Sequence, residues 1–188
     1  MGITENVFIS HCKTYFDNAK SILELGAQHY ITSGRIIGYF SNIFKQYNIV
    51  SIDLNGENTS LKIDLTKNIT LDKPYDLITN FGTSEHVSNQ YNCWKNIHSM
   101  LSEDGIIISE IPEISSWKGH CKYYVDYRFF NAMHKDFEII DYRSIFYSDN
   151  GYLSFSIMKK KSIVFETPIE EFNKFIVVDE SVKDRISF

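Results

Sequence analysis

The sequence has few cysteines, and their positions do not suggest a disulfide framework or a metal site. It contains three cysteines in 188 residues, and no two of them stand in a C-x-x-C arrangement. An odd number without such spacing argues against a disulfide scaffold and a zinc site, and it favours a reducing compartment. We therefore predict no metal. Four histidines also stand at no ligand-like spacing: His11, His29, His98 and His134.

Long basic runs and long apolar runs are missing as well. The net charge is −5, and only residues 159–161 form a lysine run, which is typical of a solvated strand end. A nucleic-acid-binding surface needs a basic stripe, so we expect no nucleic-acid partner. No apolar run reaches membrane-spanning length and no secretion signal is visible, so we expect a cytoplasmic protein without a membrane partner. The length predicts a single domain over 1–188.

Two common catalytic fingerprints are also absent. The chain has no G-x-S-x-G elbow, which excludes a typical serine hydrolase. It has no G-x-G-x-x-G either, which disfavours a nicotinamide-dependent dehydrogenase. What is present is the stretch SILELG at 21–26, followed by an amphipathic segment and by NIVSID at 48–53. A strand that ends in a glycine turn, and a second strand that ends in a carboxylate, predict a cradle for an adenosine-containing cofactor.

Apolar periodicity and turn residues predict the order of the remaining elements. Ser33 is an N-cap candidate for a helix over 34–47, whose apolar residues form a regular stripe. Thr167 to Glu170 resemble a capping box with proline at the first helical position. Residues 111–122 have neither a helical nor a strand period. We expect helices over 1–19, 34–47, 87–101, 123–134 and within a C-terminal extension over 163–188, a turn at 103–105, and strands over 21–25, 49–53, 61–64, 75–79, 106–109, 137–142 and 152–158.

This order, together with several motifs, resembles the class I S-adenosylmethionine-dependent methyltransferases, in particular the small-molecule branch. The motifs are LELGA at 23–27, Asp53, Asp64 followed by Leu65, YDLITNFGTSEHV at 75–87 and NIHSMLSEDGIIISEIP at 96–112. The resemblance covers about residues 20–160. It implies a doubly wound, mostly parallel, seven-stranded α/β sheet of Rossmann-like type, with three layers and a terminal antiparallel hairpin.

The resemblance also implies which residues meet S-adenosylmethionine. Asp53 matches the acidic residue that holds the ribose hydroxyls, and Asp64 with Leu65 matches the adenine position. Gly26 matches the first-motif glycine. The full expected set is Glu24, Gly26, Ala27, Gln28, Asp53, Leu54, Asp64, Leu65, Asn80, Phe81 and Gly82.

The glycine turn departs from the family pattern. The first motif usually reads Gly-x-Gly, but position 28 is Gln and a longer connection follows before Gly34. Either Gly34 supplies the second glycine after an insertion, or the turn is remodelled and Gln28 or His29 reaches into the pocket. The connection after Asp53 is short as well, with ten residues (54–63) before Asp64, so we expect a loop in place of a crossover helix.

Three residues are candidates for catalytic contact with an acceptor. His120 lies in the irregular loop, His86 lies at the start of a helix, and Glu110 ends the strand over 106–109. A positioned base accelerates transfer to a proton-carrying oxygen or nitrogen. Two of them also have a structural reading: His86 as a helix-start residue and Glu110 as a backbone cap. For His120 no core role is evident, whereas the nearby aromatic residues can be read as core.

Two hypotheses from different classes follow. The first is a methyltransferase that acts on the oxygen or nitrogen of a small molecule, with a sugar or sugar-derived metabolite as one acceptor class. The second is a non-catalytic domain of the same fold that serves as a binding scaffold. The sequence leaves the acceptor and the oligomeric state open.

Overall fold

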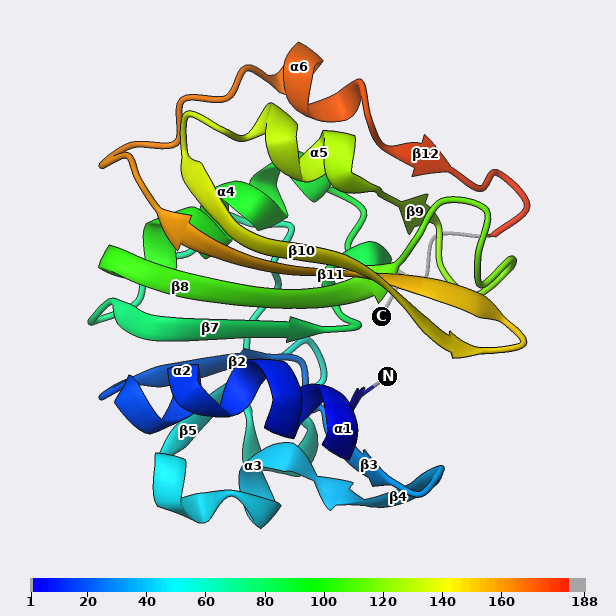
Figure 1. The fold of residues 1–188 in the computed structure, drawn as a ribbon. Coiled ribbons are helices and arrows are strands. Elements are labelled where there is room, and N and C mark those ends of the chain that lie inside the picture. The colour runs from blue at the N-terminus through cyan, green and yellow to red at the C-terminus, as the bar shows by residue number, and fades with distance from the viewer. Residues whose placement is uncertain (1, 183–188) are drawn as a thin grey trace.

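The computed structural model describes residues 2–182, and within them seven strands form one central sheet. The strand order is β10-β11-β8-β7-β2-β5-β6 (Figure 1). β11 runs antiparallel to both neighbours, whereas the pairs from β8 to β6 are parallel. This confirms the predicted mostly parallel sheet with a terminal antiparallel hairpin. The strands are β2 (Ile22–Leu25), β5 (Ile49–Asp53), β6 (Leu61–Lys62), β7 (Tyr75–Phe81), β8 (Leu101–Pro112), β10 (Phe137–Ser148) and β11 (Gly151–Lys160).

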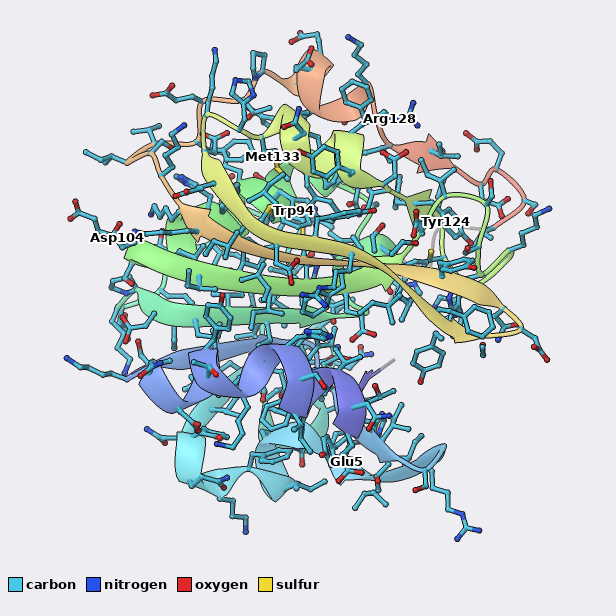
Figure 2. All side chains as sticks on the ribbon, in the orientation of Figure 1. Glu5, Trp94, Asp104, Tyr124, Arg128 and Met133 are labelled. Atoms are coloured by element: carbon cyan, nitrogen blue, oxygen red, sulfur yellow. The ribbon has the colours of Figure 1, made fainter. Side chains whose placement is uncertain are left out.

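Two hydrophobic clusters, one on each face of the sheet, give the protein three layers. Ile107 and Ile108 are both fully buried in β8 but belong to different clusters. Successive side chains of a strand point to opposite faces, so the sheet is covered on both sides. Trp94 and Met133 lie in the cluster under α4 and α5 (Figure 2). Phe16 lies in the cluster on the other face.

Helices cover both faces of the sheet. The helical stretch near the N-terminus begins at Glu5, because residues 2–4 form a short strand; the predicted helix is confirmed from Glu5 onward. Residues 183–188 of the expected C-terminal extension lie outside the described residues. The helices are α1 (Glu5–Val7), the π-helix η1 (Phe8–Cys12), α2 (Lys13–Asn18), α3 (Phe40–Ile43), α4 (Gln90–Met100), α5 (Tyr127–Ala132) and α6 (Ile169–Asn173), with 3₁₀ helices η2 (Lys45–Tyr47), η3 (Glu57–Thr59) and η4 (Ser84–His86).

The predicted helix over 34–47 is wrong. The segment forms the hairpin β3 (His29–Thr32) and β4 (Arg35–Tyr39), followed by the short α3. Ser33 and Gly34 both have positive φ, 50° and 73°, as a two-residue primed turn requires. The isoleucines of the predicted apolar stripe are consequently outside the core: Ile36 is 64% exposed and Ile37 is 55% exposed.

Two further small sheets lie beside the central one. β3 pairs in parallel with β1 (Gly2–Thr4), so the N-terminal strand joins the hairpin. The predicted helix over 123–134 shortens to α5, because residues 123–124 form β9 (Tyr123–Tyr124), which pairs with β12 (Val177–Val178). In Figure 1 both small sheets lie at the end of the central sheet where β7 ends.

Several predicted boundaries differ in smaller ways. The expected turn at 103–105 lies inside the longer β8, where the pairing with β7 shifts between Tyr75 and Leu77. The capping box is not formed, since Pro168 occupies the N-cap of α6 and the Thr167 hydroxyl donates to the buried Asp136. The lysine run does lie at a strand end, where Lys159 pairs with Asp104 at 2.8 Å (Figure 2 labels Asp104). No helix within residues 2–182 is long and apolar enough to cross a membrane.

Candidate functional site

A cavity of about 400 Å³ lies at the carboxyl ends of the central parallel strands. Open α/β sheets bind ligands at this edge, outside the carboxyl ends of the strands. The loops after β2, β5, β6 and β7 supply its walls. The lining residues are Gly26, Ala27, Gln28, His29, Asp53, Leu54, Asn55, Glu57, Ile63, Asp64, Leu65, Thr66, Gly82, Thr83, His86 and Val87.

Asp53 ends β5 and lies in the wall of this cavity. Its Oδ1 accepts the backbone N–H groups of Asn55 at 2.7 Å and Gly56 at 3.1 Å. These bonds fix the carboxylate at the strand end and form the turn that replaces a crossover helix. The short loop expected after Asp53 is therefore present, with only the 3₁₀ turn η3 before β6.

Asp64 and Leu65 form the next part of the wall. The Asp64 Oδ1 accepts the backbone N–H of Thr66 at 2.9 Å and its hydroxyl at 2.7 Å. Burial acts to raise the pKa of Asp64, but the hydrogen bonds from Thr66 outweigh it and hold this pKa below the ordinary value. Leu65, Ile63 and Val87 add apolar surface to the cavity. A charged acceptor beside an apolar wall suits a flat heteroaromatic ring with donor groups.

The glycine turn after β2 is closed by side chains of this chain. Gly26 has a φ of +74°, and a Cβ added there would lie 2.5 Å from the Thr83 Oγ1 and 2.6 Å from the Gln28 Nε2. The Gln28 Nε2 donates to the Leu25 carbonyl at 3.0 Å and to the Thr83 Oγ1. Of the two alternatives for this turn, the structure selects the remodelled one. Gly34 instead lies in the β3–β4 turn, while Gln28 and His29 both line the cavity.

Glu24 does not line the cavity. It is fully buried in β2 and accepts a hydrogen bond from the Ser51 hydroxyl of the neighbouring β5. Burial raises its pKa to about 7; the hydrogen bonds of its carboxyl with Ser51, the Gln28 backbone and Ser41 oppose this rise. Glu24 thus supports the glycine turn from inside the protein, through its hydrogen bonds with Ser51 and the Gln28 backbone.

Asn80 and Phe81, which were expected to meet the cofactor, lie inside the protein. The Asn80 Nδ2 donates to the hydroxyls of Ser84 at 2.8 Å and Ser109 at 2.9 Å, and its Oδ1 accepts the Ser84 N–H at 3.0 Å. Phe81 packs in the hydrophobic cluster that contains Phe16. Only Gly82 of this trio lines the cavity. Asn80 therefore holds the turn η4, which carries His86 to the cavity wall.

The structure brings two of the three catalytic candidates together, with a third residue that the sequence did not single out. The rings of His86 and His120 have centroids 5.1 Å apart. The His86 Nε2 lies 3.8 Å from the Oε1 of the buried Glu85. One ligand atom from each of these three residues lies within 4.8 Å of the other two. We call Glu85, His86 and His120 the histidine cluster.

Glu110 lies apart from the cavity wall. It is 1% exposed on β8, beside Phe81 of β7 and Phe155 of β11 in the sheet register. Neither of its oxygens accepts a hydrogen bond from a residue within 2–182. Burial and then the charge of Glu85 raise the pKa of Glu110 above its ordinary value. Glu110 is therefore not among the residues that line the cavity, and its carboxylate does not cap a backbone group within 2–182.

The loop that carries His120 is held by several hydrogen bonds. The Trp117 N–H donates to the Asn150 carbonyl at 2.8 Å, and the Tyr124 hydroxyl donates to the Trp117 carbonyl at 2.8 Å. The Ser116 Oγ accepts the Tyr152 N–H at 3.0 Å. His120 itself donates its backbone N–H to the Trp117 carbonyl at 3.0 Å. The irregular segment predicted over 111–122 is thus confirmed from Glu113 onward, because residues 111–112 belong to β8, and these hydrogen bonds hold the loop in place.

Comparison with known proteins identifies the fold. No family model and no curated protein sequence matches the chain. Among solved structures, it is similar to the N-methyltransferase NodS from Bradyrhizobium japonicum WM9 in complex with S-adenosylhomocysteine. The TM-score is 0.55, the identity is 11%, and the match covers 77% of this chain and 79% of that one. It is also similar to a Burkholderia thailandensis 1,6-didemethyltoxoflavin-N1-methyltransferase with bound S-adenosylhomocysteine. There the TM-score is 0.54, the identity 13%, and the coverage 77% of this chain and 72% of that one.

A third similar structure has a different reaction in its name. It is the [4+2]-cyclase SpnF, with a TM-score of 0.54, 10% identity and coverage of 74% of both chains. Identities of this size show a shared fold. The chain therefore has the class I methyltransferase fold that its motifs predicted, and the reaction must be argued from its own residues.

Proposed function

We propose that this protein is an S-adenosylmethionine-dependent methyltransferase that acts on an oxygen or nitrogen of a small molecule. The observation that carries the proposal is the cavity at the carboxyl edge of a methyltransferase-type sheet, with Asp53 and Asp64 in one wall. Its volume lies within the range of small-ligand sites. Two similar solved structures are methyltransferases with S-adenosylhomocysteine bound.

The residues present fit the proposed cofactor. The Asp53 carboxylate would accept the ribose hydroxyls, and Asp64 with the apolar wall of Leu65 would take the adenine. The Gln28 Oε1 is buried and accepts no hydrogen bond from a residue within 2–182, although Gln28 lines the cavity. A buried carbonyl oxygen of this kind needs a donor. We assign it to the ammonium of the methionine end.

The bound cofactor supplies an electrophilic methyl group, and the protein's part is alignment. Methyl transfer is an in-line displacement, so holding the acceptor in line with the methyl group supplies much of the rate. The wall formed by Gly82, Thr83 and His86 lies across the cavity from Asp64 in the order of the strands. We assign the acceptor to this wall, where His86 and His120 are the groups able to receive a proton.

A binding measurement tests the proposal. Wild-type protein titrated with S-adenosylhomocysteine in a calorimeter should give one site per chain. Asp53→Ala should weaken binding at least about 100-fold, because hydrogen bonds to a charged group contribute roughly 1.5–3 kcal/mol each. Asp53→Asn keeps an oxygen for the Asn55 and Gly56 N–H groups, so it separates a lost contact from a disordered turn. The matched control is Asp72→Ala, an exposed acid outside the cavity.

Absence of binding by the wild type at high micromolar ligand would contradict the proposal. If binding is seen, transfer of a labelled methyl group to a panel of hydroxyl and amine acceptors, including sugars, tests the reaction itself.

A second candidate is a non-catalytic domain of the same fold that acts as a binding scaffold. The specific observation in its favour is that Gln28 and Thr83 fill the space against Gly26. The similar structure SpnF is named as a [4+2]-cyclase, so a protein of this fold can carry the name of another reaction. Cofactor binding without methyl transfer to any acceptor would favour this candidate.

A further inference from the structure

Glu85 is a buried carboxylate at the carboxyl edge of the sheet, and neither oxygen accepts a hydrogen bond from any residue over 2–182. It is 1% exposed and belongs to the turn η4. A buried carboxylate is ordinarily paired, hydrogen-bonded or bound to a metal, because an isolated buried charge is very unfavourable. Glu85 is therefore a buried carboxylate that a bound cation would stabilise.

Two imidazoles lie beside Glu85. The Glu85 Oε1 is 3.8 Å from the His86 Nε2, and the rings of His86 and His120 are 5.1 Å apart. One ligand atom from each residue lies within 4.8 Å of the other two. Ligands about 2.0–2.2 Å from a tetrahedral zinc ion are roughly 3.3–3.5 Å apart. Small side-chain rotations of the two half-buried histidines would bring the three atoms to that spacing.

The chain holds the three ligands on supports that the fold has already ordered. The Asn80 side chain and Gln90 hold η4, with the Gln90 Nε2 donating to the Val87 carbonyl at 2.6 Å. The loop of His120 is tied to Asn150 through the Trp117 N–H. Metal sites need such supporting contacts to orient their ligands.

We infer that Glu85, His86 and His120 form a zinc site, whose fourth position is open to the cavity. Two imidazoles and one carboxylate with an open position are the donor set of catalytic zinc sites, and imidazole disfavours magnesium and calcium. The inference goes against the expectation of no metal, which rested on histidines that stand elsewhere. His86 and His120 are 34 positions apart in the sequence, so no local spacing shows the site.

The position of the site indicates a class of acceptor. His86 lines both the cavity and the histidine cluster. A ligand group entering the fourth position would therefore stand at the wall that we assign to the acceptor. Hydroxyl, phenol or enol oxygens coordinate zinc and become more acidic when they do so, and their proton passes to solvent. In the zinc-loaded protein the metal would therefore activate the oxygen, in place of the two imidazoles that it binds. Resting on the proposed methyl transfer, this points to an oxygen acceptor over an amine.

Zinc binding can be measured without a cofactor or a substrate. Full-length protein stripped with a chelator and exchanged into metal-free buffer is titrated with zinc chloride by calorimetry, and metal per chain is counted by elemental analysis. We expect one zinc per chain with a micromolar or tighter Kd, and no comparable heat with magnesium chloride. His86→Ala and His120→Ala should each weaken zinc at least about 10-fold.

Two controls keep the result interpretable. His134→Ala removes an exposed histidine outside the cluster and should bind zinc as the wild type does. Glu85→Gln keeps the shape of the buried side chain and removes its charge, so it should weaken zinc while a circular dichroism spectrum shows the native fold. Failure of the wild type to bind stoichiometric zinc, or wild-type affinity in both histidine variants, overturns the inference.

The same samples separate this inference from the proposed function. S-adenosylhomocysteine is titrated into the metal-free protein and into the zinc-loaded protein. Cofactor binding without zinc binding overturns the zinc site and leaves the methyltransferase proposal in place. Zinc binding without cofactor binding overturns the methyltransferase proposal and leaves the zinc site in place.

Discussion

The two ends of the cavity are built in different ways. Asp53 and Asp64 each end or follow a strand, and short local hydrogen bonds fix their carboxylates. The histidine cluster joins η4 to a loop 34 residues further along the chain, and it is held by contacts from Asn80, Gln90, Asn150 and Tyr124. The first end follows from contiguous sequence, whereas the second exists only after the chain has folded.

This difference suggests a division of labour. The end built from local motifs has the groups that we propose for the adenosine of the cofactor. The end assembled by tertiary contacts has the titratable groups that we propose as zinc ligands. Changes at the first end should therefore alter cofactor affinity or stability, and changes at the second end should alter acceptor chemistry.

The largest expected effect in the first region concerns the buried Glu24. Its pKa is about 7 in the folded chain against an ordinary 4.5. Between these pH values the folded chain keeps a proton on Glu24 that the unfolded chain has released, so stability falls as pH rises. The full difference is roughly 3 kcal/mol. Glu24→Gln should therefore gain up to roughly that amount relative to wild type between pH 4.5 and 7.5.

Urea unfolding of both proteins across this pH range measures the effect. Glu103→Gln, which removes an exposed acid, is the control and should follow the wild type. A constant difference between Glu24→Gln and wild type across the range would show that Glu24 is ionised in the folded protein.

The next largest effect concerns Gln28, which bonds Thr83 of the wall assigned to the acceptor and lines the cavity on the cofactor side. Gln28→Ala removes the amide that donates to Leu25 and Thr83 and the Oε1 that we assign to the cofactor's ammonium. We expect S-adenosylhomocysteine to bind about 10-fold more weakly, the loss of one hydrogen bond to a charged group. Calorimetry measures it, with Gln46→Ala as the exposed control. Tighter binding by Gln28→Ala would instead mean that Gln28 obstructs the cavity.

The smallest effect separates the observed hairpin from the predicted helix. Gly34 has a φ of +73°, and nothing lies within 4 Å of a Cβ added there. Gly34→Ala should destabilise the fold by about 1 kcal/mol, because only backbone strain changes. In a helix the same substitution would stabilise by about 1 kcal/mol. Thermal or urea unfolding gives the sign.

Gly38→Ala is the matched control for this sign test. Gly38 lies in β4, and an added Cβ would meet only the Ile43 side chain, at an ordinary 3.6 Å. Its stability should stay within about 0.5 kcal/mol of wild type.

The sequence predicted the sheet because its central strands are short apolar runs between turn residues. Residues 49–53 form β5 as expected, and the other predicted strands differ mainly at their ends. It failed over 34–47, where isoleucine and phenylalanine spacing matched a helix. The Ser33-Gly34 pair between the β-favouring segments 29–32 and 35–39 was the competing signal. Ile36 and Ile37 lie in the edge strand β4, which does not need to bury its side chains. Their helix-like spacing therefore did not indicate a buried helical face.

The residues of the candidate site also differ in how far the sequence could predict them. The positions that line the cavity and were named from the sequence lie at strand ends: Asp53 ends β5, Gly26 follows β2 and Asp64 follows β6. Glu24, Asn80 and Phe81 belong to the same motifs but support the site from inside the core. Glu85 stands in the quoted motif, yet its partner His120 can be identified only from three-dimensional proximity.

The most direct test of the central claim is a crystal structure of the protein with S-adenosylhomocysteine. We predict the ribose at Asp53, the adenine at Asp64 and Leu65, and the sulfur directed toward the wall of Gly82, Thr83 and His86. A ligand bound outside this cavity, or bound with its adenine at His86, would contradict the assignment of the two ends.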